Sequence, residues 1–522
     1  MIEPIQGSRC PACGLTVAPP TPFCPRDPVE MTPVELEGAG EIVSFTTLHS
    51  PPAGFRSSLH IALVALDGGA RFICHGAETR GLTTSLISAR WTAPASSGGA
   101  PVVRVTACTR SPGASPSEPG KEESVSRADQ PLVGVRVLDL TRVLAGPFCS
   151  MMLGDMGAEV IKIEEPGKGD DTRSWPPFAG GESTYFMSVN RNKKSVTLNL
   201  KAPEGQAILR TLVGKSDVLV ENFRPGTMDK LGFGYRALAR RHPRLVYCSI
   251  SGFGESGPEA HRAGYDLVVQ AESGIMDITG FSDGPPVKVG TSIADLVAGM
   301  SAAHGVTLAL LARTRTRRGQ KVEISMLDAM AALLTYQAGI YFGTGQRPAR
   351  RGNAHPSIVP YEVFKAADAY LTLGVANNAL WAKCCAALDR PELATDPRFD
   401  TEARRVTNRD VLIPLLNEIL GARTAEEWLK RFESAGVPAG RIKSVPEVCE
   451  SPHLKARAMI VTLPHPQAGR VTALGVPIRL HATPGRARLA PPVLGQHTDA
   501  VLRMLAGLTR SELARLRGRG II

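Results

Sequence analysis

Two common phosphate- and metal-binding motifs are missing from this sequence. It contains no Walker A and no H-E-x-x-H pattern, so ATP and metalloprotease chemistry lack their usual marks. Its G-x-G-x-x-G stretch, "GFGESG" at residues 252–257, follows an extended run and contains Glu255. That context predicts a surface turn rather than a phosphate cradle for a nicotinamide cofactor.

Long apolar runs are also absent. Runs such as "GVTLALLA" and "AALLTYQAGIYF" fall short of the roughly 20 residues that a membrane-spanning helix needs. The first residues lack the apolar region of a signal peptide. Four cysteines lie in apolar contexts without a disulfide spacing: Cys149, Cys248, Cys384 and Cys385. We therefore expect a cytoplasmic protein with reduced thiols and no membrane partner.

Aromatic residues are scarce as well, at 5% of the chain. The formal net charge is +11, but the basic residues are scattered among 49 acidic ones, and no RNA- or DNA-binding motif occurs. This pattern favours anionic small molecules over nucleic acid as binding partners.

The N-terminal stretch "CPACGLTVAPPTPFCPRD" resembles a degraded zinc ribbon. Cys10, Cys13 and Cys24 have the spacing of three ligands, but Asp27 stands where a fourth cysteine is expected. Four thiolates would satisfy a tetrahedral zinc ion, whereas three thiolates and a carboxylate are a weaker set. The sequence leaves two alternatives open, a bound structural zinc and a metal-free ribbon.

A compositional break divides the chain. Residues 110–130 are rich in Pro, Ser, Gly and charge and have no apolar periodicity, which is typical of a linker. Residues 1–109 contain strand-like runs separated by Gly and Pro, which predicts a small β-domain. Beyond the linker, extended runs such as "EVIKIE" alternate with helix-like segments. This alternation predicts an α/β fold with a doubly wound parallel sheet.

Several motifs of the second part occur together and in order. They are "RVLAGPFCSMMLGDMGAEVIKIEEPGKGD", "NRNKKSVTLNLKAPEG", "ENFRPGTMDKLGFGY", "GYDLVVQAESG", "DGPPVKVGTSIADLVAGM" and "RRGQKVEISMLDAM". With this spacing the chain, from about residue 131 to near its end, resembles the family III CoA-transferases, which include formyl-CoA, carnitine and bile-acid CoA-transferases. Residues 1 to about 110 resemble the ribbon-plus-OB modules that occur beside acyl-CoA enzymes.

The resemblance implies an architecture. A Rossmann-like large domain would be built from residues 131–345 and 446–522, with a smaller domain at 346–445 between them. Two subunits of this family are interlocked as rings, so a homodimer is implied. The implied substrates are an acyl-CoA and a carboxylic acid, with no tightly bound cofactor.

Asp295 is the residue to which the resemblance assigns nucleophilic catalysis. It stands alone among small and apolar residues in "VGTSIADLVAGM". A carboxylate can attack a thioester to form a mixed anhydride, then an aspartyl-CoA thioester. The same stretch also fits a capping box, with Ser292 as N-cap and Asp295 at the third helical position, where the helix dipole favours the ionised form. Helix capping alone is therefore a second interpretation.

The resemblance also implies contacts with CoA at eight positions. They are Leu144, Ala145, Leu198, Lys201, Asn222, Phe223, Arg224 and Lys230. Two positions depart from the family pattern: Glu165 stands where a basic residue is common, and Leu144 replaces the glutamine of formyl-CoA transferase. The glycine-rich loop of that enzyme is also absent. These departures favour an acid larger or less polar than formate or oxalate.

Two other functions remain as alternatives. Racemases of α-methylacyl-CoA share this fold, but they carry "GHD" where this chain has Gly264, Tyr265 and Asp266. Tyrosine, with an ordinary pKa of about 10, is a poor general base at neutral pH. A non-catalytic acyl-CoA-binding subunit is the second alternative, although it would not need Asp295.

Overall fold

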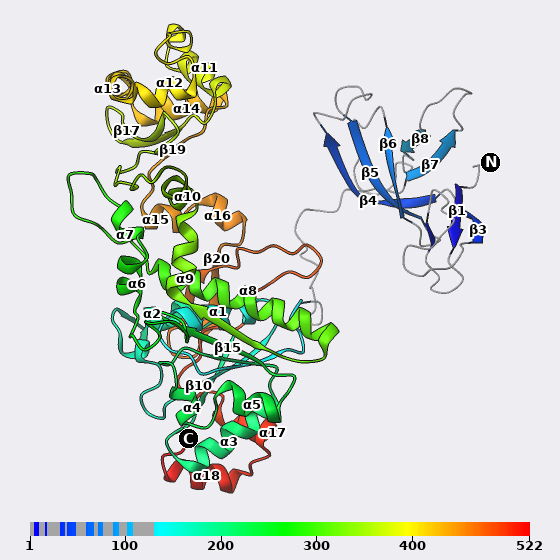
Figure 1. The fold of residues 1–522 in the computed structure, drawn as a ribbon. Helices are drawn as coiled ribbons and strands as arrows, with labels where there is room; N and C mark the ends of the chain where they lie inside the picture. The colour runs from blue at the N-terminus through cyan, green and yellow to red at the C-terminus, as the bar shows by residue number, and fades with distance from the viewer. Residues whose placement is uncertain are drawn as a thin grey trace. The chain divides into compact units, whose positions relative to one another are not determined.

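The computed structural model describes residues 130–522 and eight backbone strands in the N-terminal part. The chain forms two compact units, residues 1–121 and 122–522 (Figure 1).

The strands of the first unit form one sheet in the order β3-β1-β2-β6-β5-β4-β7-β8. Their bounds are β1 Ile5–Arg9, β2 Thr16–Val17, β3 Thr32–Leu36, β4 Ala39–Leu48, β5 Leu59–Leu66, β6 Arg71–Gly76, β7 Ile87–Thr92 and β8 Val102–Ala107. Most neighbours pair antiparallel, as in β4–β5 and β5–β6. The three candidate zinc ligands, Cys10, Cys13 and Cys24, lie outside the described residues.

A six-stranded sheet organises the second unit, in the order β13-β10-β9-β14-β15-β16. The strands are β9 Arg136–Asp139, β10 Glu159–Glu164, β13 Lys193–Thr197, β14 Val218–Glu221, β15 Val246–Ser251 and β16 Lys321–Ser325. All neighbours pair parallel. The predicted α/β fold with a parallel sheet is confirmed, and the buried β-branched residues of "EVIKIE" form β10.

One face of this sheet packs against α1 (Ala145–Asp155) and α8 (Ile293–Thr316). The two helices approach closely because Gly299 of α8 faces the Ala145 carbonyl, where a side chain would not fit. By length and composition alone, α8 could cross a membrane. Its alanine-rich side, including Ala294, Ala298 and Ala302, is fully buried in the core of the unit, so a packed core helix accounts for its composition.

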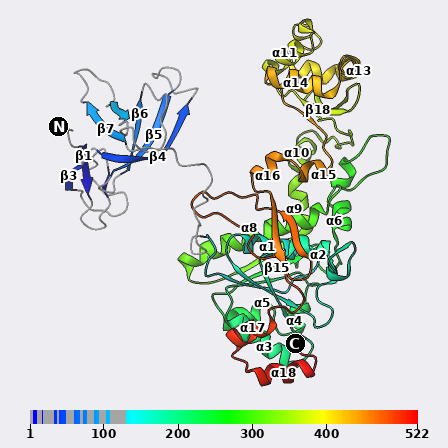
Figure 2. The ribbon, with the colours of Figure 1, turned by 180° about the vertical axis from the view of Figure 1, so that it is seen from behind.

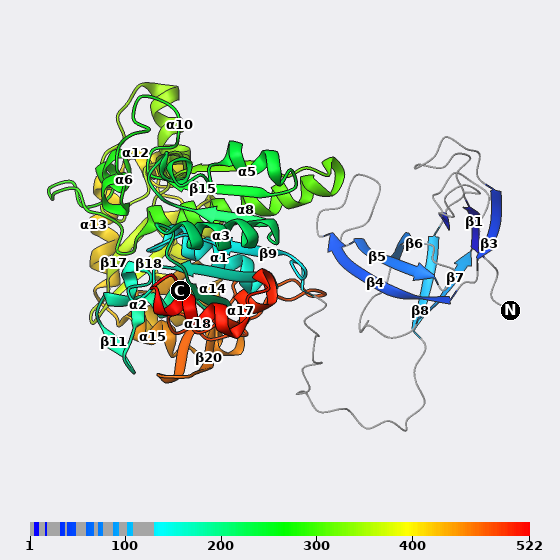
Figure 3. The same ribbon diagram turned by 90° about the horizontal axis from the view of Figure 1, so that it is seen from below.

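The opposite face carries α3 (Pro203–Gly214), α5 (Tyr235–Arg241), α17 (Thr498–Ala506) and α18 (Arg510–Gly518). Figures 2 and 3 show the last two helices, from the end of the chain, lying beside α3. Thr498 Oγ1 accepts the N–H of Thr197 at 3.0 Å. The C-terminal residues therefore complete a core that begins near residue 138.

The residues between the N-terminal and the C-terminal part of this unit form a separate core. Strands β17 (Tyr361–Lys365), β18 (Tyr370–Gly374) and β19 (Ala439–Arg441) pair antiparallel. Helices α11 (Asn378–Ala387), α13 (Arg409–Leu420) and α14 (Ala425–Ala435) pack on them around Trp381 and Trp428. Connecting this part to the sheet are α9 (Met326–Ala331), α10 (Thr335–Thr344), α15 (Val445–Cys449), α16 (Pro452–Ala456), and a hairpin of β20 (Ile460–His465) and β21 (Gly469–Leu474).

Candidate functional site

The site lies where the strand order of the sheet reverses. Strand β9 has β10 on one side and β14 on the other, so the connections after β9 and β14 leave the sheet in opposite directions. A crevice at the carboxyl ends of such strands is the usual binding position in open α/β sheets. The segment after β9 leads into α1, and Asn222 follows β14 directly.

Asp295 faces this crevice from the first turn of α8. Ser292 occupies the N-cap position, but its side chain makes no capping hydrogen bond, so the predicted capping box is wrong. The N–H of Ala294 instead donates to Asp266 Oδ1 at 2.9 Å. Asp266 begins the short helix α6 (Asp266–Glu272), and its Oδ2 accepts Gln270 Nε2 at 2.8 Å. A carboxylate from another helix therefore caps α8.

The pKa of Asp295 is raised from 3.8 to about 7. Burial is the main cause and repulsion from Asp266 the second, while a hydrogen bond from the Ala145 N–H acts in the opposite direction. The helix dipole does not keep Asp295 strongly anionic, contrary to the sequence prediction, because desolvation and a neighbouring carboxylate outweigh it. At neutral pH Asp295 is therefore less completely ionised than an ordinary aspartate.

A pocket of about 390 Å³ surrounds the Asp295 carboxylate. Four of the predicted CoA contacts line it: Ala145, Asn222, Phe223 and Arg224. Asn222 is engaged with the protein, since its Oδ1 accepts the Arg142 N–H at 2.9 Å and its Nδ2 donates to the Arg142 carbonyl at 2.8 Å. Its side chain therefore also fixes the segment that forms one wall.

A second pocket of about 280 Å³ contains the other predicted contacts, Leu198, Lys201 and Lys230, and shares Phe223. Arg142 and Phe223 line both pockets, and the guanidinium of Arg142 lies 5.8 Å from the centre of the Phe223 ring. The two pockets are therefore adjacent and separated by this stacked pair. Lys230 forms no ion pair among the described residues and is free to meet a phosphate.

Leu144 is the one predicted contact that lines neither pocket. Its buried side chain packs with Met151 and Val189 beside α1. Sequence reasoning also missed Arg142, although it is the basic residue of the "RVLAGP" motif itself. Glu165 lies 3.8 Å from Arg142 and 3.6 Å from Lys201, so it partly neutralises two cations at the pocket.

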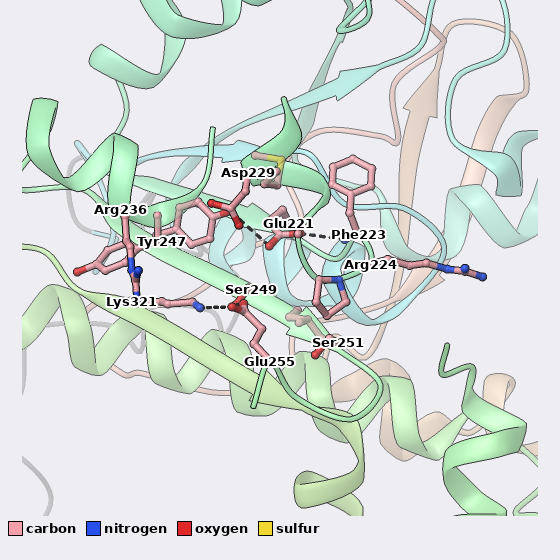
Figure 4. A pocket seen from close by; sticks show the side chains of 15 residues that line it. Glu221, Phe223, Arg224, Asp229, Arg236, Tyr247, Ser249, Ser251, Glu255 and Lys321 are labelled. Atoms are coloured by element: carbon pink, nitrogen blue, oxygen red, sulfur yellow. Dashed lines mark hydrogen bonds and ion pairs between the residues drawn. The ribbon is translucent and has the colours of Figure 1, made fainter. Parts of the chain in front are cut away.

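A third pocket, of about 540 Å³, shares residues 223–225 with the Asp295 pocket (Figure 4). Its charged lining is balanced, with three carboxylates and three cations: Glu221, Asp229, Glu255, Arg224, Arg236 and Lys321. Burial raises the pKa of Glu221 to about 7, and Lys321 forms an ion pair with Glu255. The "GFGESG" stretch supplies Glu255 to this wall and makes a tight turn beside Gly264.

In the described part of the chain, no three His, Cys, Asp or Glu side chains are grouped to hold a metal ion. The cysteines of this part are free: Cys149, Cys248, Cys384, Cys385 and Cys449. Burial raises the pKa of the first four thiols, so these thiols are poor nucleophiles.

Comparison with known proteins assigns both parts of the chain. Residues 132–498 match the model of CoA-transferase family III, and residues 33–84 match the C-terminal OB-fold domain of ChsH2. The described strands β4 and β5 lie within the OB match.

Similar individual proteins include several CoA-transferases. The succinyl-CoA:glutarate CoA-transferase of Mus musculus is 43% identical over 77% of this chain and 93% of its own length. The acetyl-CoA:oxalate CoA-transferase of Acetobacter aceti is 44% identical over 70% of this chain and 95% of its own. A CAIB/BAIF family protein from Brucella suis is 39% identical, covers 72% of this chain and 100% of its own, and superimposes with a TM-score of 0.65. The chain is thus an enzyme of CoA-transferase family III, preceded by a domain of the ChsH2 OB-fold family.

Proposed function

We propose that this enzyme transfers CoA from an acyl-CoA to a dicarboxylic acid, with Asp295 as the covalent nucleophile. The observation that carries the proposal is the position of Asp295 in a pocket bordered by the Ala145 N–H and by the cations Arg142 and Arg224. The cations suit an anionic thioester and an anionic acceptor.

The steps follow from carboxylate chemistry. Asp295 attacks the thioester carbonyl of the donor and expels CoA thiolate, which leaves a mixed anhydride. The thiolate then attacks the Asp295 carbonyl, releasing the donor acid and forming an aspartyl-CoA thioester. The acceptor carboxylate repeats these two steps in reverse and leaves as its CoA thioester, with Asp295 regenerated. No acyl group is released to water.

The environment of Asp295 favours the covalent intermediates. Burial and Asp266 destabilise the anionic carboxylate, whereas both the anhydride and the thioester of Asp295 are uncharged. Acylation therefore removes the unfavourable charge. The raised pKa also makes the ionised form a stronger nucleophile than an ordinary aspartate.

Relatives support a dicarboxylic acceptor. The named acids of similar CoA-transferases include glutarate, oxalate and D-citramalate. Arg224 borders the reactive pocket and forms no ion pair among the described residues, so it can meet a second carboxylate. Arg262 is already paired with Glu259 and Glu272. We infer a donor such as succinyl-CoA and an acceptor longer than oxalate. Such an acid is larger than formate, as the sequence suggested, but not less polar.

The test combines exchange with trapping. Asp295→Asn should lower CoA exchange between succinyl-CoA and glutarate by several orders of magnitude while acyl-CoA still binds. Hydroxylamine added with succinyl-CoA alone should convert Asp295 to a hydroxamate that peptide mass spectrometry locates. Pentanoate, which lacks the second carboxylate of glutarate, is the matched acceptor control. Near-native exchange by Asp295→Asn, or a label on Asp266, would refute the assignment.

We also propose that the enzyme acts as a homodimer. Helix α10 has no buried residue, and Phe342 on it is 82% exposed. On α8, Leu308 and Leu311 are more than half exposed. Apolar helix faces of this kind require a partner, and interlocked subunits would cover them. Light scattering of active enzyme should give the mass of two chains; an active monomer would contradict the proposal.

A further inference from the structure

The segment between β9 and α1 is held in place by one local side chain and by two from distant parts of the chain. The Thr141 N–H donates to Asp139 Oδ1 at 2.8 Å, and the Thr141 carbonyl accepts Lys162 Nζ at 2.7 Å. Asn222 binds both backbone groups of Arg142. The conformation of residues 141–143 is therefore set by Lys162 and Asn222 as well as by the local hydrogen bond to Asp139.

Val143 has an unusual backbone conformation within this segment. Its φ is +68°, in the left-handed region that a β-branched residue rarely adopts. Its N–H donates to Asp170 Oδ1 at 3.3 Å. Two residues later, the Ala145 N–H points at the Asp295 carboxylate. A strained backbone conformation persists only where surrounding contacts hold it. At Val143 such a contact is the hydrogen bond to Asp170.

Asp170 is itself rigidly anchored. Its Oδ2 lies 2.9 Å from Lys162 Nζ, and both side chains are fully buried. Its Oδ1 also accepts the Thr172 N–H at 3.0 Å, capping the short helix η2 (Asp171–Ser174). The pKa of Asp170 is lowered to about 2, with the charge of Lys162 as the main stabilising cause against burial. Asp170 therefore remains ionised and fixed.

We propose that Asp170 is a positioning residue for the transfer reaction. By accepting the Val143 N–H, it holds Val143 in the left-handed conformation, which turns the Ala145 N–H toward Asp295. The inference rests on the proposed role of Asp295 as nucleophile. An N–H fixed in this way can stabilise the oxyanion that forms when CoA thiolate attacks the Asp295 carbonyl.

Three variants separate this role from a purely structural one. Asp170→Ala removes the acceptor, and kcat should fall by about 100-fold with little change in KM. Asp170→Asn loses the charge but keeps an oxygen for the Val143 N–H, so it should retain much more of kcat than Asp170→Ala. Adding Val143→Gly to Asp170→Ala should restore kcat at least about tenfold, because glycine adopts a positive φ without strain.

A second route keeps the ion pair intact. Val143→Pro removes the N–H donor and cannot adopt a positive φ, so it should reproduce the kcat loss even if Asp170→Ala does not fold. The control is Asp155→Asn, which breaks the buried pair with Arg191 at the far end of α1. It should lower thermal stability and leave kcat near the parent value.

Equal kcat losses in Asp170→Ala and Asp170→Asn, or native kcat in Val143→Pro, would overturn the inference. Hydroxylamine trapping distinguishes this failure from failure of the proposed function. A hydroxamate on Asp295 with an unaffected Asp170→Ala variant removes only the positioning role. Absence of the Asp295 label removes the nucleophile itself, whatever the Asp170 variants do.

Discussion

Asp295→Asn should make the folded enzyme more stable at alkaline pH while it abolishes transfer. The pKa of Asp295 is about 7 in the fold against 3.8 for an ordinary aspartate, so folding opposes its ionisation. At about 1.4 kcal/mol per pH unit, the difference sets an upper bound of about 4 kcal/mol. Because part of the side chain is still reached by solvent, which screens this cost, we expect a gain of about 2 kcal/mol.

The sign of the pH dependence follows from linkage. Above pH 7 Asp295 is ionised in both the folded and the unfolded chain, and the folded state bears the full cost. Below about pH 3 it is protonated in both states and costs nothing. The gain from Asp295→Asn should therefore be full at pH 8.5, about half as large at pH 5.5, and absent below about pH 3.

Thermal unfolding of parent and variant at one fixed protein concentration measures this difference, since the proposed dimer would melt in a concentration-dependent way. Asp283→Asn is the matched control, because Asp283 is an exposed carboxylate outside the pocket that forms no ion pair in the described structure. It should show no pH-dependent gain. If Asp295→Asn were destabilising at pH 8.5, or its effect did not change with pH, burial and Asp266 would not destabilise the ionised form of Asp295.

Three further predictions concern the charges of the site and the chain boundary. Asp266→Asn keeps an oxygen for the Ala294 N–H but removes the like charge, so the acid limb of kcat/KM should move to lower pH by about one pH unit; an unchanged limb would show that Asp266 does not act on Asp295 electrostatically. Lys230→Ala should raise the KM for succinyl-CoA about fivefold, and Glu165→Gln should lower it by about the same factor, with kcat little changed in both. Changes of the same sign would argue against a CoA phosphate near these side chains. A chain starting at residue 122 should keep transfer activity. It should also melt at a higher temperature than a chain starting at residue 131, because buried Gln130 donates to the carbonyls of Asp155 and Pro484. Equal melting temperatures would show that these hydrogen bonds do not stabilise the unit.

Sequence patterns were sufficient for the parts of this protein that depend on local order. Extended apolar runs such as "EVIKIE" identify the parallel strands, because a strand buried on both faces needs β-branched side chains along its whole length. The order and spacing of the motifs identified the family, and with it Asp295 as the candidate nucleophile. Most predicted CoA contacts also line the two adjacent pockets, since residues after parallel strands meet at one edge of the sheet.

The tertiary structure decided how Asp295 is tuned. Ser292 and Asp295 have the local spacing of a capping box, but Asp266, which is distant in the sequence, accepts the helix N–H instead. Burial and that same carboxylate raise the pKa that the helix start alone would lower. Likewise, nothing in "TRVLAGP" reveals that Val143 has a positive φ, because Asp170 and Asn222, which follow other strands, hold this segment. Desolvation and contacts between distant residues exist only once the chain has packed, so a linear pattern does not encode them in readable form.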